Sequence, residues 1–159
     1  FTQNTFGGNK GEHVFKYQDR DNGDDNRSIS IRANTFEDTI DVDRILDISG
    51  TSTRVIAKEN WFQTNQAPLM RIRVSDGHVR ILKNDFRGNR DGLLSFEHSS
   101  KSLIEVTGNE FRNNTRASNP LIDLRNDNIY VVMKNILSDN SAPIMIRVST
   151  TFLHDNSST

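Results

Sequence analysis

The chain has 159 residues, a formal net charge of −1 and no cysteine. This balance gives no general attraction for nucleic acid or an anionic membrane, and the lack of cysteine excludes disulfides and cysteine-ligated metal sites. The length is sufficient for one domain with a buried core. No apolar run approaches the roughly 20 residues that cross a bilayer, so we expect no membrane insertion by this segment. A start at Phe1 instead of Met leads us to expect a piece of a longer protein.

A six-residue motif, Asn-x-Phe-x-x-Asn, returns along the whole chain. Its copies are NTFGGN at 4–9, NTFEDT at 34–39, NWFQTN at 60–65, NDFRGN at 84–89, NEFRNN at 109–114 and a looser NILSDN at 135–140. From Asn34 onward the first asparagines lie 26, 24, 25 and 26 residues apart. The first interval is 30 residues, because the polar stretch DRDNGDDN at 19–26 is inserted. Such regular spacing predicts a repeat architecture.

Each motif after the first is preceded by a short alternating segment. Apolar residues stand five and three positions before the motif asparagine, and this period of two predicts a half-buried strand. The pairs are Ile29 and Ile31, Val55 and Ala57, Val79 and Ile81, Ile104 and Val106, and Tyr130 and Val132.

A second apolar segment follows each motif from the second copy onward. The segments are RILDI from Arg44, PLMRI from Pro68, GLLSF from Gly92, PLIDL from Pro120 and PIMIRV from Pro143. Short apolar runs that open at Pro or Gly are typical of strands and not of helices.

These elements predict an all-β fold. No helical stripe separates the strands, a β-propeller blade would need ~40 residues, and the leucine spacing of leucine-rich repeats is absent. We therefore predict a right-handed parallel β-helix solenoid of about six coils of ~25 residues. Residues 1–159 form one domain in this prediction, with an irregular first coil over 1–28, the polar insertion at 19–26, regular coils over 29–150 and a tail over 151–159.

Two columns of motif residues are expected to hold the coils together. The third motif position points inward and forms a structural core ladder: Phe6, Phe36, Phe62, Phe86, Phe111 and Leu137. The first position forms a structural asparagine ladder at a corner: Asn4, Asn34, Asn60, Asn84, Asn109 and Asn135. We attribute the choice of asparagine to its tolerance of left-handed backbone angles and to its amide, which can bond the next coil.

The motif and the segments APLM and NPLI resemble right-handed parallel β-helix repeats of the pectin-lyase-like class. They are similar to repeats of large cell-surface proteins of the Anakonda (Bark beetle) type, found at insect tricellular junctions, and to the FxxN repeats of chlamydial polymorphic membrane proteins. The GGAI half of the chlamydial signature is missing. The resemblance covers residues 29–150 and implies the fold; it also implies two kinds of function, because many pectin-lyase-like proteins cleave acidic polysaccharides.

The candidate binding residues lie at outward positions. Trp61 alternates with inward Phe62 and should face solvent beside Thr35 and Asp85, where an exposed indole can anchor a protein or stack on a sugar. Arg71 and Arg73 lie on the outward face of the second strand, in columns whose charges alternate in sign. Because each carboxylate of these columns has an arginine nearby, we assign no catalytic residue and no cofactor.

Two further sets of residues are candidates for a metal site and for glycosylation. Asp19, Asp21 and Asp24 could bind Ca²⁺ in the inserted turn, although their spacing is not that of an EF-hand. Asn26, Asn113 and Asn156 open N-x-S/T sequons, a number that 18 asparagines produce by chance.

The expected function is that of a non-enzymatic extracellular scaffold and adhesion module, a segment of a larger cell-surface or junction protein. Its partner would be another protein or a second copy, with a glycan as a further ligand and no nucleic acid. The alternative is a carbohydrate-active β-helix, a polysaccharide lyase or hydrolase or a glycan-binding relative.

Overall fold

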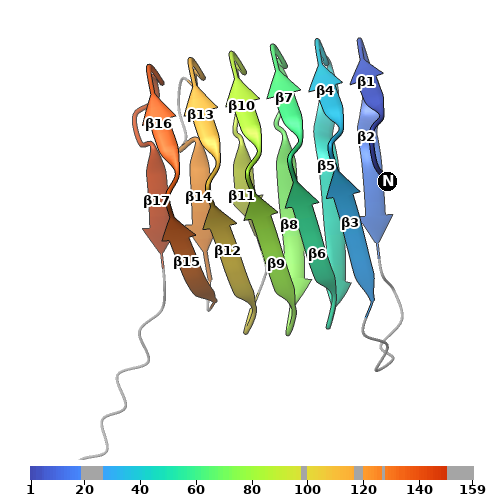
Figure 1. The fold of residues 1–159 in the computed structure, drawn as a ribbon, viewed down its shortest axis with the longest axis vertical. Coiled ribbons are helices and arrows are strands. Elements are labelled where there is room, and N and C mark those ends of the chain that lie inside the picture. Colours follow the sequence, from blue (N-terminus) through green and yellow to red (C-terminus); the bar gives the residue numbers. More distant parts are fainter. Residues whose placement is uncertain (19–26, 98–99, 117–119, 127, 150–159) are drawn as a thin grey trace, which may run out of the picture.

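A computed structural model describes residues 1–18, 27–97, 100–116, 120–126 and 128–149. These residues form 17 strands in three parallel sheets that run the length of the molecule (Figure 1). Sheet A contains β3 (Ser28–Arg32), β6 (Arg54–Lys58), β9 (His78–Leu82), β12 (Leu103–Thr107) and β15 (Ile129–Met133). Sheet B contains β1 (Thr5–Gly7), β4 (Thr35–Glu37), β7 (Trp61–Gln63), β10 (Asp85–Arg87), β13 (Glu110–Arg112) and β16 (Ile136–Ser138). Sheet C contains β2 (Gly11–Gln18), β5 (Val42–Thr51), β8 (Met70–Ser75), β11 (Leu94–Phe96), β14 (Ile122–Arg125) and β17 (Ile146–Ser149).

Each turn of the chain contributes one strand to every sheet, in the order A, B, C. In Figure 1 the strands of sheet A rise in front and those of sheet C descend behind while the chain advances from right to left, which is a right-handed winding. The predicted parallel solenoid is therefore confirmed. Sheets B and C have six strands in the described residues and sheet A has five, so the molecule has about five full turns and a partial first one. In that first turn Thr2 supplies only a single bridge to Arg32.

The predicted core ladder occupies the inner face of sheet B. Phe36, Phe62, Phe86 and Phe111 are completely buried. Consecutive rings from Phe6 to Phe111 are stacked, with centroids 4.8–5.0 Å apart and planes within 10° of parallel. Parallel strands in exact register place each ring directly on the next, at the distance where offset stacking is favourable.

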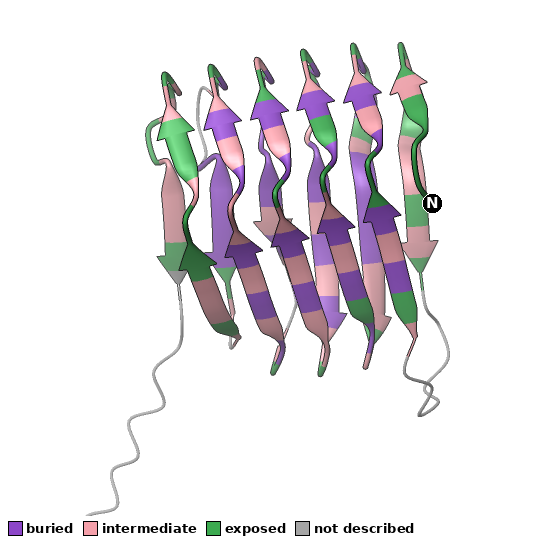
Figure 2. Cartoon of the chain, in the orientation of Figure 1, coloured by how far each residue is buried: buried purple, intermediate pink, exposed green. Residues whose placement is uncertain are grey.

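The inward residues of the other two sheets complete the core. The alternating pairs predicted before each motif are buried from Ile29 to Val106, and the second apolar segments bury Leu46, Met70, Leu94 and Ile122 opposite them. Figure 2 shows buried bands that continue across the inner strands of sheets A and C. At the last coil this order ends, because Leu137 and Val132 are 37% and 39% exposed.

The asparagine ladder forms with uniform hydrogen bonds. The backbone N–H and the side-chain Nδ2 of Asn60 both donate to Oδ1 of Asn84, each at 2.9 Å. Nδ2 of Asn60 also donates to the Ile31 carbonyl at 2.9 Å. The same pattern links Asn84 to Asn109, and Asn109 to Asn135. These bonds satisfy corner groups that are buried away from water.

The last motif position forms a second ladder of the same kind. Asn65, Asn89 and Asn114 are fully buried, and each is joined by its backbone N–H and Nδ2 to Oδ1 of the next asparagine at 2.9–3.1 Å. Thr39 and Asn9 continue the column toward the first coil.

The backbone reason given for the first ladder is wrong. The left-handed residue at this corner is the one before the asparagine: Ala33 (φ 51°), Glu59 (φ 57°) and Lys83 (φ 51°), and at the next coil Gly108 (φ 68°). None of the ladder asparagines from Asn4 to Asn135 has a positive φ. Asparagine is needed at these positions for its amide, which accepts and donates along the column, and not for its backbone freedom.

Candidate functional site

Trp61 is the only strongly exposed aromatic side chain among the described residues, with 59% of its surface accessible. It lies on β7 and pairs in register with Thr35 and Asp85, which confirms the predicted outward orientation. The backbone N–H of Trp61 donates to the Asn34 carbonyl at 2.8 Å, and the neighbouring Asn60 and Phe62 are fully buried. The indole is therefore presented on a backbone that is held firmly on both sides.

Two shallow hollows lie beside the Trp61 indole. One, of about 190 Å³, is lined by Trp61, Gln63, Asp85 and Arg87. Arg87 donates to Asp85 at 2.8 Å, which keeps both polar groups beside the ring. The other hollow, of about 360 Å³, is lined by Ala33, Asn34, Thr35, Glu59 and Trp61. An aromatic face with fixed polar groups next to it suits contact with a protein side chain or a sugar ring.

The outer face of sheet C contains a carboxylate that is surrounded by cations. Asp47 on β5 is 1% exposed and accepts hydrogen bonds from Arg71 at 2.7 Å and from Arg73 at 3.1 Å. His13 lies 3.8 Å away. Burial disfavours the ionised form of Asp47, but the hydrogen bond and charge of Arg71 and the charge of Arg73 outweigh it, so the pKa of this carboxyl is lowered.

Asp123 on β14 repeats this arrangement three coils away. It accepts hydrogen bonds from Arg125 at 2.7 Å and from Arg147 at 2.9 Å. Burial again opposes ionisation, and the hydrogen bonds of Arg147 and Arg125 overcome it, so the pKa of Asp123 is lowered as well. Both outward carboxylates are thus held ionised by two arginines each, a state that suits neither a general acid nor a general base.

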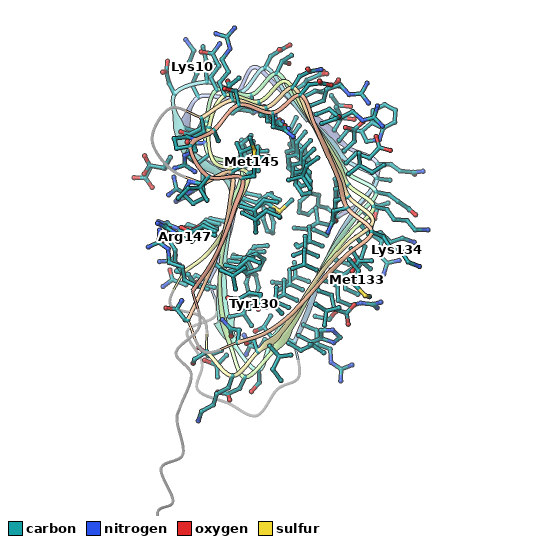
Figure 3. All side chains as sticks on the ribbon, turned by 90° about the vertical axis from the view of Figure 1, so that its left-hand side faces the viewer. Lys10, Tyr130, Met133, Lys134, Met145 and Arg147 are labelled. Atoms are coloured by element: carbon teal, nitrogen blue, oxygen red, sulfur yellow. The ribbon has the colours of Figure 1, made fainter. Side chains whose placement is uncertain are left out.

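A groove of about 180 Å³ lies along the outer face of sheet C and includes Asp123 in its lining. Arg44, Ser95, Glu97, Arg116 and Arg125 are among its lining residues. Figure 3 shows the cross-section, in which the connection near Met145 turns inward before the strand that carries Arg147. The lining contains both positive and negative side chains, so the groove offers a ligand paired polar contacts and has no strong net electrostatic field.

Arg44 differs from the other arginines of the groove. It is half-buried and donates to the Asp43 carbonyl at 2.6 Å, but it forms no salt bridge with a carboxylate of the described residues. Burial, followed by the nearby charge of Arg71, lowers the pKa of this guanidinium. Arg116 in contrast lies 3.3 Å from Asp91. Among the described residues, Arg44 is therefore the cation of the groove that lacks a direct counterion.

The predicted binding residues do not form one site. Arg71 and Arg73 share Asp47 on sheet C, whereas Trp61 lies on sheet B, and the two sheets face different directions (Figure 3). The sequence pattern identified the outward arginines, but it did not single out Arg44 or the groove. The sequence signal that could have identified Arg44 is its place at the start of RILDI, where the later segments have Pro or Gly.

The candidate metal residues Asp19, Asp21 and Asp24 lie outside the described residues, as do the sequon residues Asn26 and Asn156. Within the described ranges, no group of three or more His, Asp or Glu side chains could hold a metal ion. Asn113 is exposed at a turn with φ 53°, so the side chain of this sequon is accessible.

His78 on β9 belongs to a separate ion-pair cluster on sheet A. Its Nε2 lies 2.9 Å from Glu105, and Arg80 donates to the other oxygen of the same carboxylate at 3.1 Å. This cluster occupies the outer face of the sheet, away from the groove.

Comparisons with protein-family models, curated proteins and solved structures found no match to this chain. The part of the chain that the structure describes has no helix long and apolar enough to cross a membrane. The parallel pairing of the strands defines the solenoid, and the outward side chains carry the indications of its function.

Proposed function

We propose that the chain is a non-enzymatic extracellular scaffold and adhesion module, a rigid segment of a larger cell-surface or junction protein that acts through protein–protein contacts. The observation that carries this proposal is the exposed indole of Trp61 on a firmly held sheet. Large aromatic side chains contribute strongly to binding when they are pre-organised, because little conformational freedom is lost on contact. The two arginine-bound carboxylates give further support, since they are occupied in stabilising the surface.

The proposal is tested by adhesion of coated beads. Beads that carry the wild-type chain should adhere to cells, and Trp61→Ala should reduce this adhesion severalfold while the melting temperature stays nearly unchanged. Thr5→Ala is the matched control, because Thr5 occupies the same outward column two coils away and lines neither hollow. A large loss of stability in Trp61→Ala would assign the indole to packing, and wild-type beads that do not adhere would refute the proposal.

The second candidate is a glycan-binding or carbohydrate-active solenoid, and the groove on sheet C favours it. The half-buried guanidinium of Arg44 has no carboxylate partner among the described residues, so an acidic sugar could supply one. Binding of oligouronates should then be lost in Arg44→Met and kept in Arg54→Met, a change on the outer face of sheet A. Cleavage of a uronic-acid polymer by the wild type, absent in Arg44→Met, would replace the scaffold proposal with an enzymatic one.

A further inference from the structure

The C-terminal end of the solenoid exposes apolar side chains at positions that are buried in every earlier full coil. Val132, Leu137 and Val148 occupy inward positions of sheets A, B and C, and they are 39%, 37% and 57% exposed. In Figure 3 this end faces the viewer, and the labelled side chains of Tyr130 and Met145 lie at its open cross-section. Apolar surface of this kind is costly in water and marks a place of contact.

The N-terminal end presents a complementary apolar surface. Phe1 packs against Phe6 and Phe15, with ring centroids 5.7 Å and 4.7 Å apart, and all three rings are half-buried. Tyr17 is half-buried on the same coil. The strand registers place Phe6, Phe15 and Tyr17 at the head of the inward columns that end in Leu137, Ile146 and Val148.

The asparagine ladders give the two ends opposite hydrogen-bonding character. In each step, the asparagine nearer the N-terminus donates its backbone N–H and Nδ2 to Oδ1 of the next one. Among the described residues, the backbone N–H of Asn135 therefore has no acceptor, and Oδ1 of Asn4 has no donor. The second ladder ends in the same way at Asn140 and Asn9.

This polarity selects one arrangement of two copies. If two C-terminal ends met, the free donors of one Asn135 would face those of the other, which leaves buried polar groups unpaired. If a C-terminal end meets an N-terminal end, the donors of Asn135 meet the Oδ1 acceptor of Asn4. In sheet B the edges also match in length, since β16 and β1 have three residues each.

We propose that a second copy of this chain stacks head to tail on the first, so that its first coil continues the last coil of its partner. Phe6, Phe15 and Tyr17 of one copy then cover Leu137, Ile146 and Val148 of the other, and both asparagine ladders run on across the junction. The contact is heterologous, so further copies can add in the same direction. This goes beyond the proposed function, because stacking requires neither Trp61 nor adhesion.

Sedimentation velocity of the full chain at increasing concentration tests the proposal. The wild type should form dimers and longer species as concentration rises. Tyr17→Lys blocks the N-terminal end and Val148→Lys blocks the C-terminal end, and each variant alone should associate at least tenfold more weakly, because a buried unpaired ammonium opposes contact. An equimolar mixture of the two variants should form a one-to-one complex and nothing larger. The open C-terminal end of Tyr17→Lys can bind the open N-terminal end of Val148→Lys, and both outer ends of this complex are blocked.

Several outcomes would overturn the proposal. A wild type that stays monomeric at submillimolar concentration shows that the ends are covered in another way. Self-association of Tyr17→Lys alone shows a tail-to-tail contact. Trp61→Ala is the control, and it should stack like the wild type, so failed adhesion and failed stacking are separable.

If either lysine variant does not fold, hydrogen exchange of the wild type decides. Protection should rise with concentration at β1 and β16 together, and a rise at only one of the two strands contradicts head-to-tail stacking.

Discussion

At the scale of the residue, Phe86 and Asn84 stabilise neighbouring coils through different forces. Phe86 is completely buried between Phe62 and Phe111, with ring centroids at 5.0 Å and 4.8 Å. Asn84 gives up its hydration and regains hydrogen bonds to Asn60, Asn109 and the Ala57 carbonyl. Burial of the Phe86 ring stabilises the folded state, whereas the hydrogen bonds of Asn84 only offset the cost of removing its amide from water.

Phe86→Ala should lower the free energy of unfolding by about 3–5 kcal/mol, because a buried ring is removed and the stacked neighbours cannot collapse into the space. Urea unfolding measures the change. Phe6→Ala at the half-buried end is the matched comparison and should cost less. A change below ~1 kcal/mol for Phe86→Ala would contradict its place in the ladder.

Asn84→Asp should destabilise the fold by about 3 kcal/mol or more at neutral pH, since both Nδ2 hydrogen bonds are lost and a charge is buried. The loss should shrink at acidic pH, where the carboxyl can be protonated and can donate again. Asn113→Asp is the control, because Asn113 is exposed and the change should stay within about 0.5 kcal/mol. Thermal melts at two pH values distinguish the variants, and equal effects would refute the role of the buried amide.

The inward phenylalanines and the two asparagine columns could be predicted from spacing alone, because identical residues at one coil position must stack in a parallel solenoid. The left-handed corner residues could not. Ala33, Glu59 and Lys83 share no side-chain property, and only the backbone path forces a positive φ on them. The second partner of Asp47 could not be predicted either, because Arg73 turns from its own column toward this carboxylate and leaves Glu97 to Ser95.

At the scale of the element, the outer face of sheet C is stabilised by two buried carboxylates, each of which is held by two arginines. Asp47 and Asp123 have lowered pKa values, so the folded protein binds protons at these groups less readily than the unfolded chain does. Their stabilising contribution is complete above the ordinary carboxyl pKa of about 4 and is lost as the pH falls through the lowered folded-state values.

The melting temperature should therefore fall as the pH is lowered below about 4, and the Asp47→Asn/Asp123→Asn double variant should fall less steeply over the same range. At neutral pH the double variant should be the less stable protein, because its arginines lose their counterions. Calorimetric melts between neutral and strongly acidic pH measure both effects. Parallel curves for the two proteins would show that these carboxylates contribute nothing to the pH dependence.

The strands of sheets A and C could be predicted from alternation and from the Pro and Gly that open the second segments. The three-residue strands of sheet B could be expected only as part of the motif, since a single inward Phe gives no alternation to read. The groove on sheet C was missed, because it depends on the distance between sheet C and the connections that supply Pro68, Gly92 and Arg116 to its lining. That distance is a tertiary property which the residue pattern does not encode.

At the scale of the whole molecule, the coils are interchangeable units that contact only their neighbours. Stability in such an array is close to a sum of coil and interface contributions. The residues directly before two successive ladder asparagines have the same backbone conformation, since Glu59 and Lys83 both have a positive φ.

Deletion of residues 60–83 should accordingly leave a folded, shorter solenoid. Glu59 would join Asn84, and Phe36 would stack on Phe86, so every column stays in register. Small-angle scattering should show an axis shortened by one strand spacing of about 4.8 Å, with a lower melting temperature. Deletion of 60–71, about half of that coil, is the control and should abolish folding. Loss of the fold in both deletions would contradict the independence of the coils.

The uniform step between coils also has a consequence for how the chain reaches this structure. The partners along the asparagine ladder are 24 to 26 residues apart, except at the first step, where they are 30 apart. Every loop that must close during folding is therefore of similar, moderate length, and no single closure carries an exceptional entropic cost. Folding can nucleate at any adjacent pair of coils and spread in both directions, with the first coil joining last because its loop is the longest.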